Sequence, residues 1–277
     1  MSALTRIAAV ASIEFRIALR NRWVILSTAM LTLFALALSF PGEGGAVLKV
    51  DALTLSAASL STLSVYLIPL IALLVSYDSI AGEVERGTMA IVLATPLQRI
   101  ELLLGKFIGL TTVVTIAITI GFGIAAAVTA GLYGSDAAGI AAWLRLLLTA
   151  LLLGAVFVAA GMAISAIAPR SGLAAALAVG VWLVVAVLYD LVLLGGLVAD
   201  DGGVFTKVMF PYLVIANPGD AFRIFNLAAL EAAAPVSGLD GLASTLPFPP
   251  IYVLAALAAW LLAMLALGFA GTRRLKP

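Results

Sequence analysis

The sequence predicts an all-α integral membrane protein with six spanning helices, and three observations support that fold class. Hydrophobic residues make up 64% of the 277 positions, whereas charged residues make up only 10%. A soluble domain of this length needs more polar surface than this to cover its core. The mean hydropathy of +1.22 and the recurrence of long apolar runs agree with this. We therefore interpret residues 1–277 as a single membrane domain.

Each long apolar run predicts one crossing of the membrane. A hydrocarbon core takes roughly 20 residues of helix to cross. The runs must be helical, because an open strand would leave backbone N–H and C=O groups without partners in lipid. The expected spans are Trp23–Phe40, Leu60–Tyr77, Phe107–Leu132, Leu146–Ala168, Leu173–Val198 and Ile251–Ala270.

The distribution of basic residues predicts how these spans are oriented. With the N-terminus inside, 11 of the 15 Lys and Arg residues fall in inner segments and 4 in outer segments, as the positive-inside rule favours. The even number of crossings then also places the basic tail Thr272–Pro277 inside. We expect a multi-pass protein of the bacterial inner (cytoplasmic) membrane with both termini in the cytoplasm.

The residue types that the sequence lacks exclude several classes of function. It has no cysteine and no histidine, which removes thiolate and imidazole metal ligands, Ser-His triads and zinc-protease sites. The six methionines lie in separate segments, so no single span offers copper a series of thioether ligands. The phosphate loop Gly-x-x-x-x-Gly-Lys-Ser/Thr is also missing. We expect this chain to have no catalytic site and to bind no metal and no cofactor.

Residues 1–22 show an amphipathic pattern ahead of the first span. Apolar and charged side chains alternate there at helical spacing, with Ile7, Val10, Phe15 and Leu19 among Arg6, Glu14, Arg16 and Arg20. This pattern predicts a helix that lies along the inner interface. The alternative is a basic flank that only sets the orientation of the first span.

The inner segment at residues 78–106 carries explicit helix signals. A short charged helix is predicted from Ile80 to Ala94. A second helix is predicted to restart at Thr95, with Pro96 in its first position and Gln98 completing a capping box. A charged helix held at the membrane surface and joined to two spans is suited to transmit movement. The alternative is an ordinary solvated loop.

The outer segment at residues 200–250 is far longer than a turn. Asn217 and Pro218 predict the start of a helix there, as N-cap and first residue. Polar residues three apart then form one stripe with two phenylalanines beside it, namely Asp220, Arg223 and Asn226 with Phe222 and Phe225. Such a helix either covers the outer end of the bundle or offers these five residues as a docking surface to an extracytoplasmic protein.

Asp190 is the one ionisable residue predicted to lie well inside a span, and such residues are functional candidates. It follows Leu173 by 17 residues, or roughly 26 Å of helix, which places it near the outer interface. There we expect it to reach water or to pair with Arg145. A proton relay has little support, because the sequence predicts no second buried acid or histidine at that depth.

The inner segment resembles a known family. The string from Ser79 to Thr88, Ser-Ile-Ala-Gly-Glu-Val-Glu-Arg-Gly-Thr, is followed by Leu-Ala-Thr-Pro-Leu, Arg99 and Lys106. It is similar to the coupling region of ABC-transporter permeases of the type-2 exporter class. The resemblance implies a coupling helix that seats on a separate cytoplasmic ATPase subunit, which binds the ATP and magnesium. The residues implied in that contact are Glu83, Glu85, Arg86, Gly87 and Thr88.

The outer helix resembles one particular subgroup of these permeases. Its string from Asn217 to Leu227, Asn-Pro-Gly-Asp-Ala-Phe-Arg-Ile-Phe-Asn-Leu, is similar to permease subunits of the ABC transporter that matures the copper sites of nitrous-oxide reductase in Gram-negative denitrifiers. That family implies a homodimer, an ATPase on the inner face and a periplasmic partner of β-helix type. A sulfur species is the usual candidate for transport. Alternatives are an ABC exporter permease for an unrelated small or lipid-like substrate, and an ion-driven secondary transporter.

Overall fold

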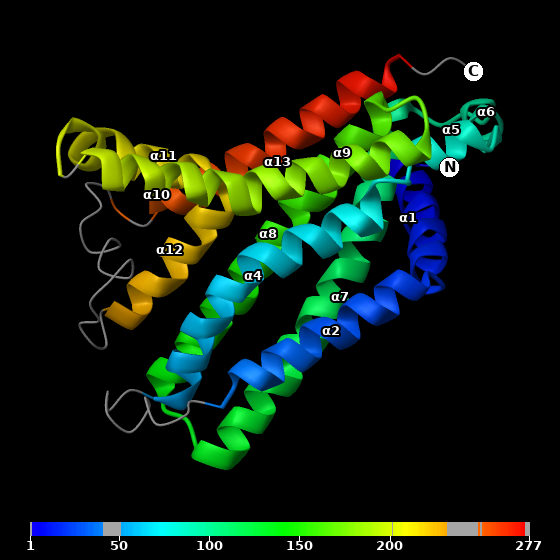
Figure 1. Cartoon of the computed structure of the whole chain (residues 1–277). Coiled ribbons are helices and arrows are strands. Elements are labelled where there is room, and N and C mark those ends of the chain that lie inside the picture. Colours follow the sequence, from blue (N-terminus) through cyan, green and yellow to red (C-terminus); the bar gives the residue numbers. More distant parts are fainter. Residues whose placement is uncertain (1, 41–50, 201, 232–248, 250, 275–277) are drawn as a thin grey trace.

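The computed structural model describes residues 2–40, 51–200, 202–231, 249 and 251–274 (Figure 1). Within these ranges every regular element is a helix, and two short elements, η1 and η2, are π-helical. In chain order the elements are α1 (Ala3–Leu19), α2 (Arg22–Leu38), α4 (Ala52–Ser76), α5 (Ala81–Glu85), α6 (Thr88–Leu93), α7 (Arg99–Tyr133), α8 (Ala137–Ile167), α9 (Ser171–Leu183), η1 (Val184–Leu188), α10 (Tyr189–Asp200), η2 (Phe205–Met209), α11 (Phe210–Ala216), α12 (Pro218–Glu231) and α13 (Ile251–Thr272).

Five helical rods are long and apolar enough to cross a membrane, namely α4, α7, α8, the continuous α9–η1–α10 rod and α13. A sixth span results if α1 and α2, which meet at an angle of 71°, are counted as one broken span. Each of the six predicted apolar runs therefore falls on a helix. The predicted N-terminal helix is also present, as α1.

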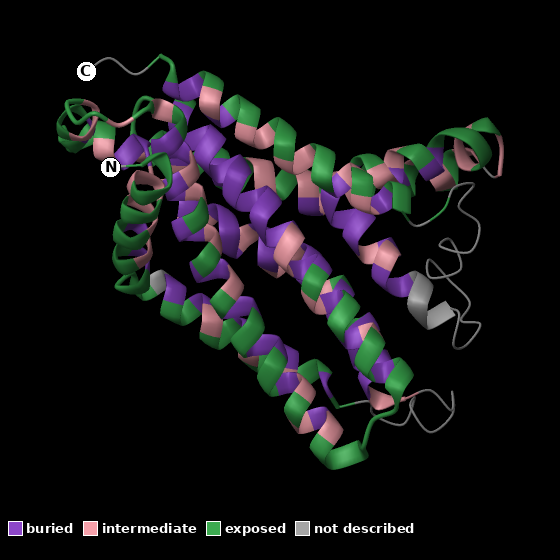
Figure 2. Ribbon diagram, turned by 180° about the vertical axis from the view of Figure 1, so that it is seen from behind, coloured by how far each residue is buried: buried purple, intermediate pink, exposed green. Residues whose placement is uncertain are grey.

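Helix α8 forms the centre of the bundle and packs against both α4 and α13. Every residue from Leu153 to Ala166 is buried, and buried residues are purple in Figure 2. Small residues make this packing possible, because a Cβ at Gly161 would lie 2.0 Å from the Ser76 hydroxyl oxygen of α4. Close approach at small residues is how helices associate in a solvent that is as apolar as they are.

Carboxylates cap two helices at one end of the bundle. Asp51 accepts the Leu53 N–H of α4 at 2.9 Å, and Asp136 accepts the Gly139 N–H of α8 at 2.7 Å. The Asp136 N–H also donates to the Asp51 carboxylate at 3.2 Å, so the two caps hold the connections together. A negative side chain at a helix N-terminus satisfies free N–H groups and matches the helix dipole.

The opposite end of the bundle gathers both ends of the described chain with α5 and α6 (Figure 1). There Arg99, the first residue of α7, donates to the Thr272 carbonyl oxygen at the end of α13, at 2.9 Å. Helix α7 has 35 residues, or roughly 50 Å, which exceeds a hydrocarbon core of about 30 Å. Part of α7 therefore extends beyond the spanning part, and its first turns contact α1 and α5.

Candidate functional site

The predicted helix Ile80–Ala94 is in fact two short helices, so that prediction is wrong. Helix α5 ends at Glu85, and Gly87 takes a φ of 72° in the left-handed region before α6 begins at Thr88. Glycine adopts this conformation without the steric cost that a Cβ brings. The chain turns sharply here, and the Thr88 hydroxyl closes the turn by donating to the Glu83 carbonyl oxygen at 3.2 Å.

The predicted capping box is also misplaced. Thr95 lies in the turn that precedes the helix, where its hydroxyl donates to the Val92 carbonyl oxygen at 2.6 Å. Helix α7 begins after Gln98, whose N–H donates to the Glu101 carboxylate at 2.9 Å while its own side chain accepts a backbone N–H of the first turn. The capping box therefore runs from Gln98 to Glu101, three residues beyond the predicted one.

A buried lysine joins α5 to α1 and α7. Lys106 of α7 is 1% exposed, and its Nζ donates to the Glu83 carboxylate of α5 at 2.6 Å and to the Glu14 carboxylate of α1. Glu14 is buried as well. Because buried charges are stable only when they are paired, this Glu14–Lys106–Glu83 triad fixes the three helices in one arrangement.

Helix α1 lies along the first turns of α7 through a second ion pair and two glycines. Arg6 Nη2 of α1 lies 2.5 Å from Glu101 Oε1 of α7. A Cβ at Gly109 would lie 2.7 Å from the Ala11 carbonyl oxygen, and one at Gly105 would lie 2.5 Å from the Val10 Cβ. The packing partner of the amphipathic N-terminal helix is therefore α7.

The other side of α5 is fixed to the end of α8 and the start of α9. The Ser165 hydroxyl oxygen accepts the N–H groups of Ile80 and Ala81, both at 2.9 Å. The Ser171 hydroxyl at the start of α9 donates to the Asp78 carboxylate at 2.5 Å. Helix α5 is thus held between α1 and α7 on one side and α8 and α9 on the other.

The turn between α5 and α6 is the exposed part of this assembly. Glu85, Arg86, Gly87 and Thr88 are all exposed, whereas Met89 beside them is buried and anchors α6. Glu85 accepts a backbone N–H of the α8–α9 turn at 3.0 Å, and Arg86 pairs with an Asp78 oxygen at 3.3 Å. Four of the five predicted coupling residues therefore share one surface. The fifth, Glu83, points inward to Lys106.

Helix α12 begins as predicted but lies inside the bundle. Asn217 Oδ1 accepts the Gly219 N–H at 2.9 Å, which confirms Asn217 as the N-cap. The Asn217 amide also donates to the Val185 carbonyl oxygen in the π-helical turn η1, at 2.8 Å. Helix α12 packs against α4, α8 and α13 and occupies the opening between the α4–α8 arm and the α9–α10 arm in Figure 1.

The predicted docking stripe faces the interior of the chain. Asp220 and Phe222 are both fully buried, and Asn226 is 7% exposed. The Asn226 amide donates to the Thr149 hydroxyl of α8 at 2.9 Å. The prediction that these three side chains form an exposed docking surface is wrong, because an outer partner would reach them only after α12 had left the bundle. Phe225 and Arg223 are half-buried on the same helix.

Asp190 finds a partner other than the predicted one. Its carboxylate accepts from Arg223 Nη1 at 3.1 Å, and Arg223 Nη2 donates to Asp220 at 2.6 Å. Arg145, the predicted partner, lies over the Phe225 ring at 5.7 Å. The expectation that no second buried acid lies near Asp190 is therefore wrong. Across the described ranges, no three Asp or Glu side chains gather closely enough to bind a metal ion.

A family model described as "ABC-2 family transporter protein" matches residues 8–275. The chain belongs to this family. One curated relative, "Probable ABC transporter permease protein NosY" of Stutzerimonas stutzeri, is 36% identical over 259 residues, which cover 92% of this chain and 94% of the relative. A protein of the same name from Pseudomonas aeruginosa PAO1 is 39% identical over the same shares of both chains.

These relatives confirm the resemblance to NosY-type permeases. Both are named as permeases, the membrane component of an ABC transporter, and the ABC-2 fold is in keeping with the five or six apolar spans of this chain. An ABC-2 permease implies an ATPase partner. The exposed turn Glu85–Thr88 and the partly buried cluster Asp190–Arg223–Asp220 are the two candidate functional sites.

Proposed function

We propose that this chain is the membrane subunit that couples ATP hydrolysis by a separate cytoplasmic ATPase to work at the outer face of the bacterial inner membrane. The turn Glu85–Thr88 would contact the ATPase, and Glu83 would brace that turn from behind. ATP and magnesium would be bound by the partner subunit. In this account the chain works as a homodimer, as its resemblance to the family implies.

One observation carries this proposal. The turn presents four exposed residues, while helix α5 beside it is tied to four other helices by contacts that are largely buried. A surface loop without a mechanical role needs no such bracing. Lys106 and Ser165 connect α5 directly to α7 and α8. A displacement of the turn would therefore be transmitted to two membrane-spanning helices through direct contacts.

Cross-linking tests the proposed contact cleanly, because the native chain has no cysteine. We expect Thr88→Cys to cross-link to cysteines placed around the permease-facing groove of the ATPase. The matched control is Tyr133→Cys, which is 52% exposed at the other end of α7 and should give no cross-link. Equal cross-linking at both positions, or none at Thr88→Cys in an assembled complex, would contradict the proposal.

These two cysteine variants, together with Arg274→Cys, test the proposed topology, in which both termini and the α5–α6 turn face the cytoplasm. A membrane-impermeant maleimide added to spheroplasts should label Tyr133→Cys at once. Arg274→Cys and Thr88→Cys should react only after the membrane is permeabilised, because the positive-inside bias places them inside. Labelling of Arg274→Cys in sealed spheroplasts would show that the orientation is reversed.

We further propose that the coupled work serves the copper–sulfur site of nitrous-oxide reductase. The support is the resemblance at Asn217–Leu227 together with the NosY relatives. The chain would pass a sulfur species or transmit movement to a periplasmic partner of β-helix type, and it would not conduct copper. Its thioethers remain scattered, with Met89 and Met162 buried in different parts of the fold. The buried face of α12 would support the bundle, so the partner would dock elsewhere.

A further inference from the structure

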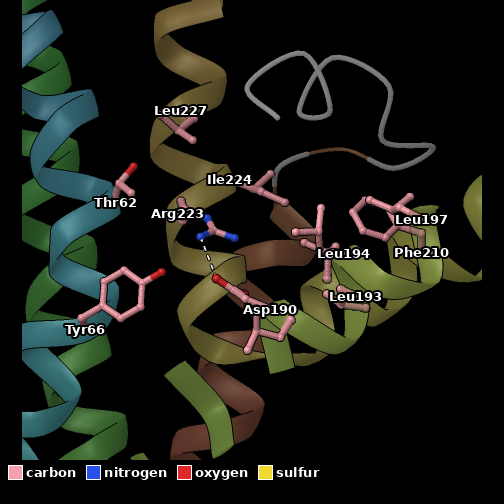
Figure 3. Close-up of a pocket in the computed structure, with 12 residues that line it drawn as sticks. Thr62, Tyr66, Asp190, Leu193, Leu194, Leu197, Phe210, Arg223, Ile224 and Leu227 are labelled. Carbon is pink, nitrogen blue, oxygen red and sulfur yellow. Dashed lines mark hydrogen bonds and ion pairs between the residues drawn. The ribbon is translucent and has the colours of Figure 1, made fainter. Parts of the chain in front are cut away.

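A cavity of about 350 Å³ lies where α4, α10, α11 and α12 meet (Figure 3). Most of its wall is apolar, and Leu194, Leu197 and Phe210 contribute large parts of it. The polar side chains Thr62, Tyr66, Asp190 and Arg223 form one side. Small-molecule sites typically enclose about 300–1,000 Å³ and combine apolar walls with a few polar groups, so this cavity has the size and lining of a site for a small ligand.

The charges beside the cavity do not balance. Arg223 is shared by two carboxylates, with Asp190 at 3.1 Å and Asp220 at 2.6 Å. Asp220 is fully buried, and its second carboxylate oxygen has no hydrogen-bond partner among the described residues. With both carboxylates ionised, the cluster carries one net negative charge. Since burying an uncompensated charge is costly, one positive charge would complete the cluster, either as a proton on a carboxylate or as a cation in the cavity.

The other titratable groups around the cluster do not supply that charge. Tyr66 of α4 presents its ring and hydroxyl to the cavity (Figure 3). Tyr189 of α10 donates its hydroxyl to the Leu213 carbonyl oxygen at 2.7 Å. Both are neutral phenols in the ordinary pH range. An anionic ligand would face the Asp190 carboxylate, and the Arg223 guanidinium beside it is already paired with Asp190 and Asp220. A cation would face a carboxylate and an aromatic ring, which is a favourable combination.

We propose that this cavity binds a small amphiphilic organic cation. Its charged end would lie against Asp190 and Tyr66, and its apolar body would lie among Leu194, Leu197 and Phe210. The cation would complete the charge balance of the cluster, and through Asp190 and Arg223 it would join α10 to α12. This proposal does not depend on coupling to the ATPase, so each can fail without the other.

Binding of benzyltrimethylammonium to the purified full chain in nanodiscs tests the proposal. This probe carries a permanent charge, so its own protonation cannot confuse the result. Radiolabelled probe should bind saturably above the level of empty nanodiscs. The neutral isostere neopentylbenzene and the anion phenylmethanesulfonate should displace it at least about tenfold more weakly than the unlabelled cation, because neither balances the cluster.

Two variants separate the contribution of the Asp190 charge to probe binding from that of the cavity shape. Asp190→Asn keeps the shape of the site and should weaken cation binding by at least about tenfold. Leu194→Trp keeps every charge but fills the cavity, so it should abolish saturable binding even if Asp190→Asn fails to fold. Absence of saturable binding to the native chain, equal displacement by the anion, or unchanged affinity in either correctly folded variant would overturn the proposal.

Discussion

Replacing Lys106 with methionine is expected to cost about 3–5 kcal/mol in the free energy of unfolding, because it removes the cation that bridges the buried Glu14 carboxylate and the partly buried Glu83 carboxylate. Methionine keeps much of the length and apolar volume of the lysine stem, so the loss reports charge and not a cavity. For a domain of this size the thermal midpoint of the purified chain should fall by roughly 10 °C. Thermal unfolding followed by circular dichroism in detergent measures it.

The matched control for Lys106→Met removes the carboxylate charges as well. In the triple variant Lys106→Met, Glu14→Gln and Glu83→Gln, no buried charge is left without a partner, so most of the lost stability should return. If the single and triple variants unfold at the same midpoint, the triad contributes through shape alone. If Lys106→Met is as stable as the native chain, the triad does not brace α5.

Gly109→Leu is expected to have an effect of similar size, because it forces α1 away from α7. The Cβ alone would lie 2.7 Å from the Ala11 carbonyl oxygen, which belongs to the backbone of α1 and has little freedom to move. Overpacking usually costs about 1–3 kcal/mol. Here separation of the helices would also stretch the Glu14–Lys106 pair. We expect a lower unfolding midpoint and easier proteolysis of α1.

Gly123→Leu is the control for Gly109→Leu, since both glycines lie within α7. No atom lies within 4 Å of a Cβ built at Gly123, and leucine favours the helix over glycine by about 1 kcal/mol or less. This variant should unfold at the native midpoint or slightly above. Equal destabilisation by both substitutions would show that the α1–α7 contact is not the cause.

The sequence predicts the spans well because crossing a membrane imposes a local requirement. A run of about 20 apolar residues is long enough to cross the hydrocarbon core as a helix and is poorly stable in water. Hydropathy alone therefore locates α2, α4, α7, α8, the α9–α10 rod and α13. The helix start at Asn217 is equally local, since an N-cap acts on residues two or three positions away. The sequence does not predict the break at Gly87, because glycine tolerates both a helix and a left-handed turn, and the burial of Met89 that accompanies the turn depends on tertiary packing.

The candidate site depends on long-range pairs that no local pattern reveals. Glu14 and Lys106 are 92 positions apart, and Asp190 and Arg223 are 33 apart. A signal for Lys106 was present, since a lysine directly before a long apolar run needs a partner or access to water. A signal for the insertion of α12 was present too, because Phe222 and Leu227 are poorly suited to an exposed helix face. The identity of each partner still required the structure.

The copper content of nitrous-oxide reductase purified from the native host tests whether this chain drives maturation of the reductase through the turn Glu85–Thr88. The chromosomal gene for this chain is deleted, or replaced by the variant Glu85→Lys with Arg86→Glu, which reverses two exposed charges without touching Lys106. We expect reductase that lacks its copper–sulfur site in both strains, although the variant chain is inserted in the membrane at the native level. A fully loaded reductase in the deletion strain would contradict the role in maturation. A fully loaded reductase in the variant strain would contradict coupling through the turn Glu85–Thr88.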